Sequence, residues 1–276
     1  LFPYTTLFRS PVPTSAGSLG CSLCEDAWDN DYSVSPIRAL ARHEPGLYVN
    51  ISSSPFTYNK NHKRHRLFLE LTRELQRPLV YVNNTGIQNN GKTVFTFDGA
   101  SCVYDGHGNC VSIREPFRET VLDLDIPAGG SPFGTPVRPH ADGIAELCSA
   151  IEYGTRRFLD LCGVSRVTVG ASGGIDSSVA AALYARIVGP GNLLLVNMPS
   201  RYNSPTTRDL AARLAAILGC CYTEVPIEDS VALTARQIDG LPVASTNGDH
   251  PAKLQLSPLM WENVQARDRS SRVLAA

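Results

Sequence analysis

The most informative stretch of this chain is Ser172-Gly173-Gly174-Ile175-Asp176-Ser177-Ser178. An apolar run over 167–171 precedes it, and an amphipathic segment follows it from near Ser177. Two adjacent glycines let the backbone turn sharply and bring its N–H groups close to an anion. The start of a helix adds a partial positive charge and unpaired N–H donors at the same place. The stretch therefore predicts a phosphate-binding loop between a strand and a helix, with Asp176 placed to hold a magnesium ion that bridges phosphates.

The segments around this loop alternate between helical and extended patterns. Helices are predicted over 143–162, 177–188 and 205–218, and strands over 167–171, 193–197 and 222–227. Apolar strands separated by amphipathic helices imply a parallel sheet that is covered on both faces. Ligands of such sheets bind at the carboxyl ends of the strands, which is where the loop over 172–178 falls.

The first half of the chain has a different pattern. Residues 19–125 contain short apolar runs separated by Asn, Gly and Asp clusters that are typical of turns. The predicted elements are strands over 78–82, 94–97 and 101–104 and a helix over 63–76. Residues 126–142 hold four prolines and three glycines, the composition of a connection between domains. We therefore expect two α/β domains, over 11–125 and 143–276, joined by a linker over 126–142.

Both ends of the sequence are unusual. Residues 1–10 resemble the conceptual translation of a common sequencing-adapter oligonucleotide, and we expect them to be an artefact without fold information. Residues 270–276 end inside an amphipathic helical pattern that has no Gly or Pro stop signal. We therefore expect the chain to be truncated at both ends.

Composition and charge exclude several classes of protein. The 25 Lys and Arg residues balance 26 Asp and Glu residues, which leaves no basic field for a nucleic-acid partner. No run of about 18 uncharged apolar residues occurs, so we expect no membrane span. Because the sequence shows no export signal either, we expect a cytoplasmic protein whose eight cysteines are reduced thiols.

The loop over 172–178 resembles the pyrophosphate loop of the ATP pyrophosphatase family, whose members transfer AMP to a substrate and release pyrophosphate. It lacks the lysine of kinase-type and GTPase-type phosphate loops. The resemblance implies that ATP and Mg²⁺ bind here, with Asp176 as the metal ligand. The implied ATP-binding residues are Gly170, Ala171, Ser172, Gly173, Gly174, Ile175, Asp176, Ser177, Ser178, Met198 and Arg201.

Two later segments narrow the family. They are NMPSRYNS over 197–204 and WENVQARDR over 261–269. Both resemble segments of NAD synthetases, which convert deamido-NAD to NAD. The resemblance implies that Asn263 contacts deamido-NAD, that ATP adenylates the nicotinate carboxylate, and that ammonia displaces AMP. Arg201 either faces the phosphates or lies in a lid over them, and Arg267 either serves the site or belongs to a solvated helix face.

Cys24-Glu25-Asp26-Ala27-Trp28 follows a short segment, 20–23, that is compatible with a strand. It resembles the nucleophile motif of the amidase domain in glutamine-dependent NAD synthetases, which belongs to the nitrilase superfamily. The resemblance implies that Cys24 attacks glutamine and forms a thioester while ammonia is released. Ser54 and Lys60 match the positions that hold the glutamine in this family.

The sequence departs from the nitrilase pattern in one respect. The family's catalytic triad includes a Glu and a Lys upstream of the Cys, and residues 1–23 contain neither. We therefore expect the glutaminase half to be inactive in this chain, because the nucleophile lacks its base and its oxyanion partner.

The implied fold is the C-terminal part of a nitrilase-type α/β sandwich, followed by the first half of a Rossmann-like parallel-sheet ATP pyrophosphatase domain. The implied protein is a carbon–nitrogen ligase and a homo-oligomer, with ATP, deamido-NAD and glutamine as small-molecule partners. One alternative is another ATP pyrophosphatase, such as a relative of GMP or asparagine synthetase or a tRNA-modifying enzyme. Another is a non-catalytic nucleotide-binding fragment with weak or no turnover.

The remaining reactive side chains suggest no further site. Cys21 and Cys24 have the C-x-x-C spacing of a redox or zinc pair, but no second pair follows at metal-ligand spacing. His62 and His65 lie in a basic run that is typical of an exposed helix start. We assign no role to any histidine.

Overall fold

The computed structural model describes residues 10–29, 32–127, 131–138, 143–244 and 252–276. All of the predicted adapter-derived segment except Ser10 lies outside these residues, as do parts of the predicted linker. The chain forms two compact units, 1–158 and 159–276, which are described separately. Among the described residues, no helix has both the length and the apolar character needed to cross a bilayer.

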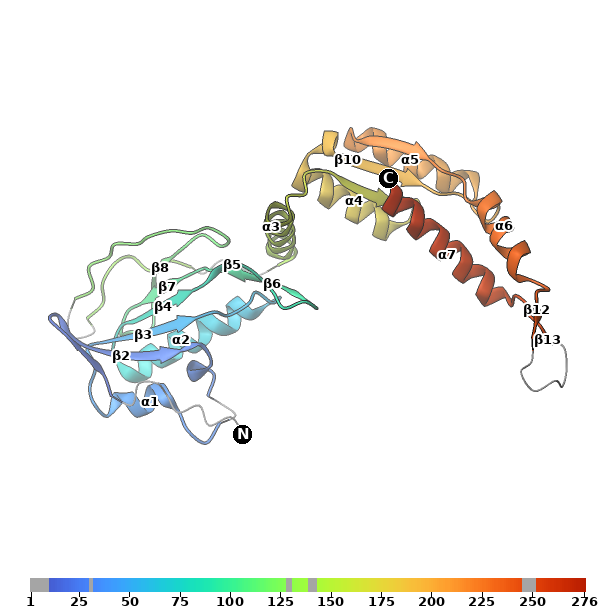
Figure 1. Cartoon of the computed structure of the whole chain (residues 1–276). Helices are drawn as coiled ribbons and strands as arrows, with labels where there is room; N and C mark the ends of the chain where they lie inside the picture. The colour runs from blue at the N-terminus through green and yellow to red at the C-terminus, as the bar shows by residue number, and fades with distance from the viewer. Residues whose placement is uncertain (1–9, 30–31, 128–130, 139–142, 245–251) are drawn as a thin grey trace. The chain divides into compact units, whose positions relative to one another are not determined.

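Unit 1 contains a six-stranded mixed sheet with the strand order β1-β2-β3-β4-β7-β8 (Figure 1). The strands are β1 (Val12–Thr14), β2 (Gly17–Leu23), β3 (Leu47–Ser52), β4 (Leu79–Asn83), β7 (Cys102–Tyr104) and β8 (Cys110–Ile113). Strands β2, β3 and β4 run parallel, and the other neighbours pair in the antiparallel sense. The carboxyl ends of the three parallel strands therefore meet at one edge of the sheet.

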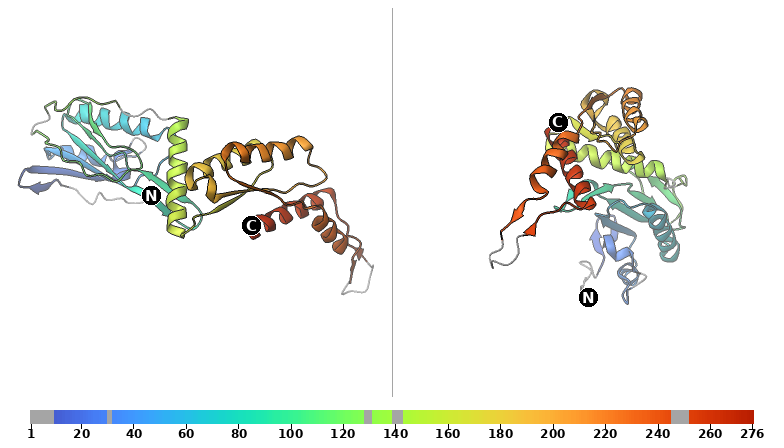
Figure 2. Two further views of the ribbon diagram at one scale, coloured as in Figure 1. Left: turned by 90° about the horizontal axis from the view of Figure 1, so that it is seen from above. Right: turned by 90° about the vertical axis from the view of Figure 1, so that its right-hand side faces the viewer.

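Two helices, α1 (Pro36–Ala41) and α2 (Lys60–Leu75), supply apolar side chains to one core with this sheet. Phe68 and Leu71 of α2 pack there among buried side chains such as Leu79 and Tyr104. Figures 1 and 2 show α2 lying along one face of the sheet. The apolar pattern of the predicted helix over 63–76 is thus explained, although the helix begins three residues earlier.

A separate hairpin joins β5 (Thr85–Asn89) to β6 (Val94–Asp98) through the Asn-rich turn expected from the sequence. The side chain of Asn90 closes this turn by accepting hydrogen bonds from the backbone N–H groups of Lys92 and Thr93. The Asp-Gly-rich turn over 105–109 links β7 and β8, and Asp105 Oδ1 accepts hydrogen bonds there from the backbone N–H groups at 107 and 109. Asn and Asp side chains thus provide the turn hydrogen bonds, as their local geometry allows.

Helix α3 (Ile144–Cys162) crosses the boundary between the two units. Its first half packs on unit 1, where Asn61 Nδ2 donates to Glu146 Oε1 at 2.8 Å and the rings of Phe117 and Tyr153 lie 5.3 Å apart. The units therefore divide inside α3 rather than within 126–142. Packing does not test where the two domains implied by the family resemblance begin and end, so those boundaries stay predictions.

Unit 2 is built on three parallel strands with the order β11-β10-β9. They are β9 (Val167–Gly170), β10 (Leu193–Asn197) and β11 (Cys221–Glu224). The predicted alternation of helix and strand is confirmed, because parallel neighbours need a crossover helix between them. The short turn η3 (Pro190–Asn192) leads into β10, and a two-stranded ribbon of β12 (Pro242–Val243) and β13 (Ala252–Lys253) lies before the last helix.

The two faces of this sheet are covered by different helices, as the apolar strands predicted. Alanines of α4 (Ile175–Val188) and α5 (Pro205–Leu218) pack against Leu193 and Leu195 of β10. On the other face, α6 (Glu228–Ile238) and α7 (Pro258–Ala275) pack around Val196. The expected fold class, an α/β layer followed by a Rossmann-like parallel sheet, is confirmed.

Two expectations from the sequence need correction. Helix α4 begins at Ile175 rather than near Ser177, because the extended backbone of Gly174 (φ −86°, ψ 164°) already forms its N-cap. His65 is not on an exposed helix start. It lies on the inner side of α2 with only 5% of its surface exposed.

Candidate functional site

Cys24 lies where β2 ends and the short 3₁₀ turn η1 (Cys24–Ala27) begins. Its backbone φ is +27°, a value that residues other than glycine seldom adopt. The turn is held by a hydrogen bond of 2.9 Å from the backbone N–H of Leu23 to Asp26 Oδ2. Strained residues of this kind cluster at active sites, where the surrounding structure fixes them.

Ser54 follows β3 and is held by the side chain of Asn83 at the end of β4. The backbone N–H of Ser54 donates to Asn83 Oδ1 at 2.9 Å, and Asn83 Nδ2 donates back to the Ser54 carbonyl at 3.2 Å. This pair of bonds fixes the loop after β3 to its neighbouring strand. Ser54 itself is 3% exposed.

Lys60 is the first residue of α2 and directs its ammonium group toward the same loop. Its Nζ donates to the carbonyl of Pro55 at 3.3 Å. Burial lowers the pKa of Lys60, the charge of Arg64 adds to the decrease, and the neighbouring Cys24 opposes it. The ammonium group therefore lies in a partly desolvated place beside the nucleophile candidate.

Cys24, Ser54 and Lys60 line one cavity of about 500 Å³ at the carboxyl edge of the parallel strands. The structure thus brings together three predicted residues that lie in separate segments of the sequence. Glu25 and Trp28, from the quoted motif, line it as well. Sequence reasoning missed the other lining residues, because nothing in their local pattern marks them: Tyr32, Pro55, Thr57, Tyr58 and Lys63.

A buried polar network contacts Ser54, one of the residues that line this cavity. Asn83 Nδ2 also donates to Asp98 Oδ1 at 3.0 Å, and Arg64 Nη1 donates to Asp98 Oδ2 at 3.2 Å. The side chains of Arg64 and Asp98 are 2% and 0% exposed. The guanidinium also lies 4.9 Å from the ring centre of Tyr81. A chain of contacts therefore runs from the buried ion pair through Asn83 to Ser54, and no local sequence pattern predicts it.

The loop of unit 2 is closed by its own serine side chains. The backbone N–H groups of Ser172 and Gly174 donate to Ser177 Oγ and Ser172 Oγ, each at 3.3 Å. The Ser178 hydroxyl donates to the Gly174 carbonyl at 2.8 Å and so bonds within the first helical turn. Because these bonds are local, consecutive residues fix the loop.

Gly173 is the position of this loop that only glycine can fill. Its φ is +80°, and a Cβ atom there would collide with the backbone carbonyl of Thr207 in the first turn of α5. The close approach brings the starts of α4 and α5 side by side. Partial positive charge from two helix N-termini therefore gathers next to the loop.

The other predicted ATP-binding residues of this loop and strand surround its base. Ala171 is buried, and its backbone N–H donates to the Val196 carbonyl at 2.9 Å. Met198 Cε would lie 3.1 Å from a Cβ atom at Gly170, so the missing side chain leaves room for the methionine. Asp176 lies in the first turn of α4 with its side chain exposed, which leaves a carboxylate open to a hard cation beside the loop.

Arg201 lies in a second cavity, of about 740 Å³, which no residue of the loop over 172–178 lines. Its Nε donates to Glu228 Oε1 at 2.6 Å, and its backbone N–H donates to Glu228 Oε2 at 3.0 Å. This ion pair lowers the pKa of Glu228. In this structure Arg201 is thus bound to the start of α6.

Helix α7 forms the opposite wall of this second cavity through Trp261, Gln265 and Arg269. Arg269 Nε donates to the Met198 carbonyl at 3.3 Å and ties α7 to the segment after β10. Asn263 and Arg267 are exposed on the same helix and do not line the cavity. The sequence predicted that the segment 261–269 belongs to the site. The structure shows that only one side of the helix faces the cavity, while Asn263 and Arg267 lie on the exposed side.

Comparison with known proteins covers both the cavity of unit 1 and the glycine loop of unit 2. A sequence profile described as NAD synthase matches residues 147–274. A glutamine-dependent NAD(+) synthetase from Rhodobacter capsulatus is 32% identical over 269 aligned positions, which cover 96% of this chain and 45% of that protein. One from Synechocystis sp. is 30% identical, over 93% of this chain and 45% of the relative.

The solved structures agree with the sequence comparison. The glutamine-dependent NAD⁺ synthetase of Acinetobacter baumannii, solved in complex with ADP, superposes with a TM-score of 0.77 at 25% identity. The match covers 96% of this chain and 47% of that one. The chain spans a little under half the length of the relatives that it matches. Because these matches run through both units and not through the parallel sheet of unit 2 alone, the chain is similar to glutamine-dependent NAD(+) synthetases over nearly its whole described length.

Proposed function

We propose that this chain carries the glutamine-binding part of an amidase site and the ATP-binding loop of an NAD synthetase site. The whole enzyme would form NAD from deamido-NAD, with ATP as the activating substrate and glutamine as the source of ammonia. The observation that supports this most directly is the common cavity of Cys24, Ser54 and Lys60. Residues that a family resemblance selects one by one have no reason to share a cavity unless they serve one ligand.

In the amidase half, Cys24 is the nucleophile. Its sulfur attacks the side-chain carbonyl carbon of glutamine, the C–N bond breaks, and ammonia leaves while a thioester remains. Water then hydrolyses the thioester to glutamate and restores the thiol. Ser54, held by Asn83, and the ammonium of Lys60 bind and orient the glutamine. For this chain we propose that glutamine binds in this cavity.

In the synthetase half, the loop over 172–178 binds the phosphates that leave ATP as pyrophosphate. Backbone N–H groups at the starts of α4 and α5 and the hydroxyl of Ser172 stabilise the negative charge. Asp176 fits a magnesium ion because it offers an exposed carboxylate in the first turn of α4. When bound, that ion neutralises charge on the phosphates.

The amidation follows from this activation. The nicotinate carboxylate of deamido-NAD attacks the α-phosphorus of ATP and displaces pyrophosphate. Ammonia then attacks the resulting acyl-adenylate, AMP leaves, and the amide of NAD is formed. We propose that the exposed Asn263 contacts deamido-NAD, while Arg201, now paired with Glu228, becomes available to the phosphates only when that pair opens.

The glutamine site can be tested on the chain itself. A diazoketone analogue of glutamine should alkylate Cys24, as read by peptide mass spectrometry, and glutamine in excess should slow the labelling. The matched control is Cys21, which lies three residues away on β2 and outside the lining of the cavity. Equal labelling of Cys21 and Cys24, with no protection by glutamine, would contradict the proposal.

The nucleotide site is tested by calorimetry with Mg-ATP. We expect binding that is lost in Asp176→Ala and retained in Asp209→Ala, an exposed carboxylate on α5 that pairs with Arg213. A second titration without Mg²⁺ should show weaker binding of ATP to the unmodified chain. If Asp176→Ala binds Mg-ATP as the unmodified chain does, the loop is not the site.

A further inference from the structure

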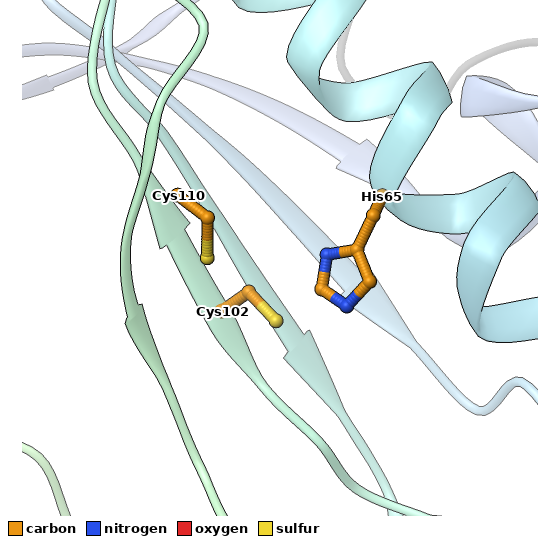
Figure 3. A group of neighbouring side chains, drawn as sticks. All are labelled: His65, Cys102 and Cys110. Carbon is orange, nitrogen blue, oxygen red and sulfur yellow. The ribbon is translucent and has the colours of Figure 1, made fainter. Parts of the chain in front are cut away.

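A group of buried ligand-type side chains lies in unit 1, away from the residues that line the amidase cavity. It consists of His65 on α2, Cys102 at the start of β7 and Cys110 at the start of β8, which we call the Cys-His cluster. Their exposed fractions are 5%, 1% and 3%. Figure 3 shows the two thiols and the imidazole pointing toward one another. The proposed function uses none of these side chains.

The irregular pairing of β7 with β8 creates this group. Val103 pairs with Ser112, but Tyr104 pairs with Cys110, so the register skips Val111. A bulge of this kind re-aims the side chains that follow it. With regular pairing Tyr104 would lie opposite Val111. The bulge instead turns Cys110 to the face on which Cys102 and Tyr104 lie, under α2.

The distances suit a metal ion. One ligand atom from each residue lies within 4.8 Å of the other two. The ligand atoms of a tetrahedral zinc site lie about 3.3–3.8 Å apart, given bonds of about 2.0–2.3 Å. The ligand atoms would therefore have to move closer together when an ion binds.

The types of ligand atom in the cluster, sulfur and imidazole nitrogen, favour a soft or borderline metal ion. Thiolate and imidazole are the ligands that Zn²⁺ prefers, whereas Mg²⁺ and Ca²⁺ prefer oxygen. Two thiolates and a neutral imidazole cancel the charge of a divalent ion, so burial of the complex avoids the cost of an unpaired charge. The nearby positive charge of Arg64 is already matched by Asp98. We propose that the Cys-His cluster binds Zn²⁺ with both cysteines as thiolates.

The hydrogen bonds of the cluster hold its side chains in place. The Cys102 thiol donates to the Ala100 carbonyl at 3.0 Å, and the Cys110 thiol donates to the Ser112 carbonyl at 3.4 Å. The Tyr104 hydroxyl lies 2.7 Å from His65 Nδ1 and holds the ring in place. Binding releases both thiol protons to solvent, so the affinity for Zn²⁺ should fall as the pH falls.

The first experiment is a titration of the reduced chain with Co²⁺ as a spectroscopic substitute for Zn²⁺. We expect a sulfur-to-cobalt charge-transfer band that saturates at one ion per chain and disappears when Zn²⁺ is added. Cys102→Ser and Cys110→Ser should each lose the band. The control variants are Cys21→Ser and the double variant Cys220→Ser/Cys221→Ser, which remove the other closely spaced thiols and should keep it.

The second experiment needs no variant and so does not depend on the folding of the serine variants. The unmodified chain is alkylated with N-ethylmaleimide under mild urea, with and without Zn²⁺, and the peptides are analysed by mass spectrometry. We expect Zn²⁺ to slow the labelling of Cys102 and Cys110 by about tenfold or more relative to Cys162, which is exposed on α3. Protection of Cys21 and Cys24 alone, no protection, or a disulfide between Cys102 and Cys110 that persists in the presence of Zn²⁺ would overturn the proposal.

Discussion

The proposed amidase cavity of unit 1 and the proposed phosphate loop of unit 2 are assembled in opposite ways. Cys24, Ser54 and Lys60 come from three segments, and a buried ion pair supports Ser54 through Asn83. The loop over 172–178 is one continuous segment whose hydrogen bonds are mostly its own. The cavity of unit 1 therefore depends on the stability of its whole unit, whereas the loop over 172–178 depends on one backbone conformation.

This comparison can be tested because the chain has two tryptophans, Trp28 in unit 1 and Trp261 in unit 2. Variants made in a Trp261→Phe background report the unfolding of unit 1 by fluorescence. Variants made in a Trp28→Phe background report the unfolding of unit 2. Each prediction below therefore specifies which unit should change.

The largest effect is expected for Asp98→Asn. It leaves the charge of Arg64 buried and unpaired, which should lower the free energy of unfolding of unit 1 by about 3–5 kcal/mol in urea titrations. Labelling of Cys24 by the glutamine analogue should fall as well, because Asn83 loses its support. The matched control is Glu115→Gln, in the exposed pair with Arg118, which should change stability by less than about 0.5 kcal/mol. Equal effects of the two variants would contradict the role given to the network.

The next effect is expected for Gly173→Ala. The new Cβ atom forces a positive φ on alanine and meets the Thr207 carbonyl, which should cost unit 2 about 1–3 kcal/mol. Mg-ATP binding should be lost together with the loop conformation. The control is Gly191→Ala in η3, where a Cβ atom meets nothing within 4 Å. If Gly173→Ala binds Mg-ATP normally, the loop tolerates other conformations and the comparison fails.

A smaller, pH-dependent effect is expected for Lys60→Met. Because burial lowers the folded-state pKa of Lys60, the charged side chain is penalised in the fold at neutral pH. The unfolded chain binds more protons between the lowered pKa and the ordinary value of 10.5, so wild-type stability should rise with pH relative to the variant across that window. Urea titrations of unit 1 from neutral pH to pH 10.5 measure this difference. Lys92→Met, in the exposed hairpin turn, controls for the loss of a positive charge.

The smallest effect is expected for Glu228→Gln, which breaks the exposed pair with Arg201. Arg201 lowers the pKa of Glu228, so any stabilisation is present above the ordinary pKa of a glutamate and is lost as the pH falls through the lowered value. We expect a slight decrease in the urea midpoint of unit 2 at neutral pH and no difference in acid. A decrease as large as that of Gly173→Ala would mean that the pair is structural.

The sequence predicted the parallel sheet of unit 2 closely because its strands are uniformly apolar and its helices are amphipathic. The strand over 193–197 has the predicted bounds, and α5 begins and ends at the predicted residues. The predicted start of α4 was two residues late, because its N-cap is the extended Gly174 and not a serine. His65 was assigned wrongly because a basic run hides a buried inner face, with Arg64 and His65 turned toward the sheet.

The sequence alone predicted the segments to which we assign the proposed chemistry, because a glycine turn before a helix or a cysteine after a strand is encoded in consecutive residues. It also determined the layer order of unit 2 through its hydrophobic pattern. Only the tertiary structure decided that Ser54 and Lys60 meet Cys24, that Arg201 is bound by Glu228, and that two cysteines lie beside a histidine. These contacts depend on strand register, a bulge and the burial of an ion pair, all of which are fixed between distant residues and leave no local pattern.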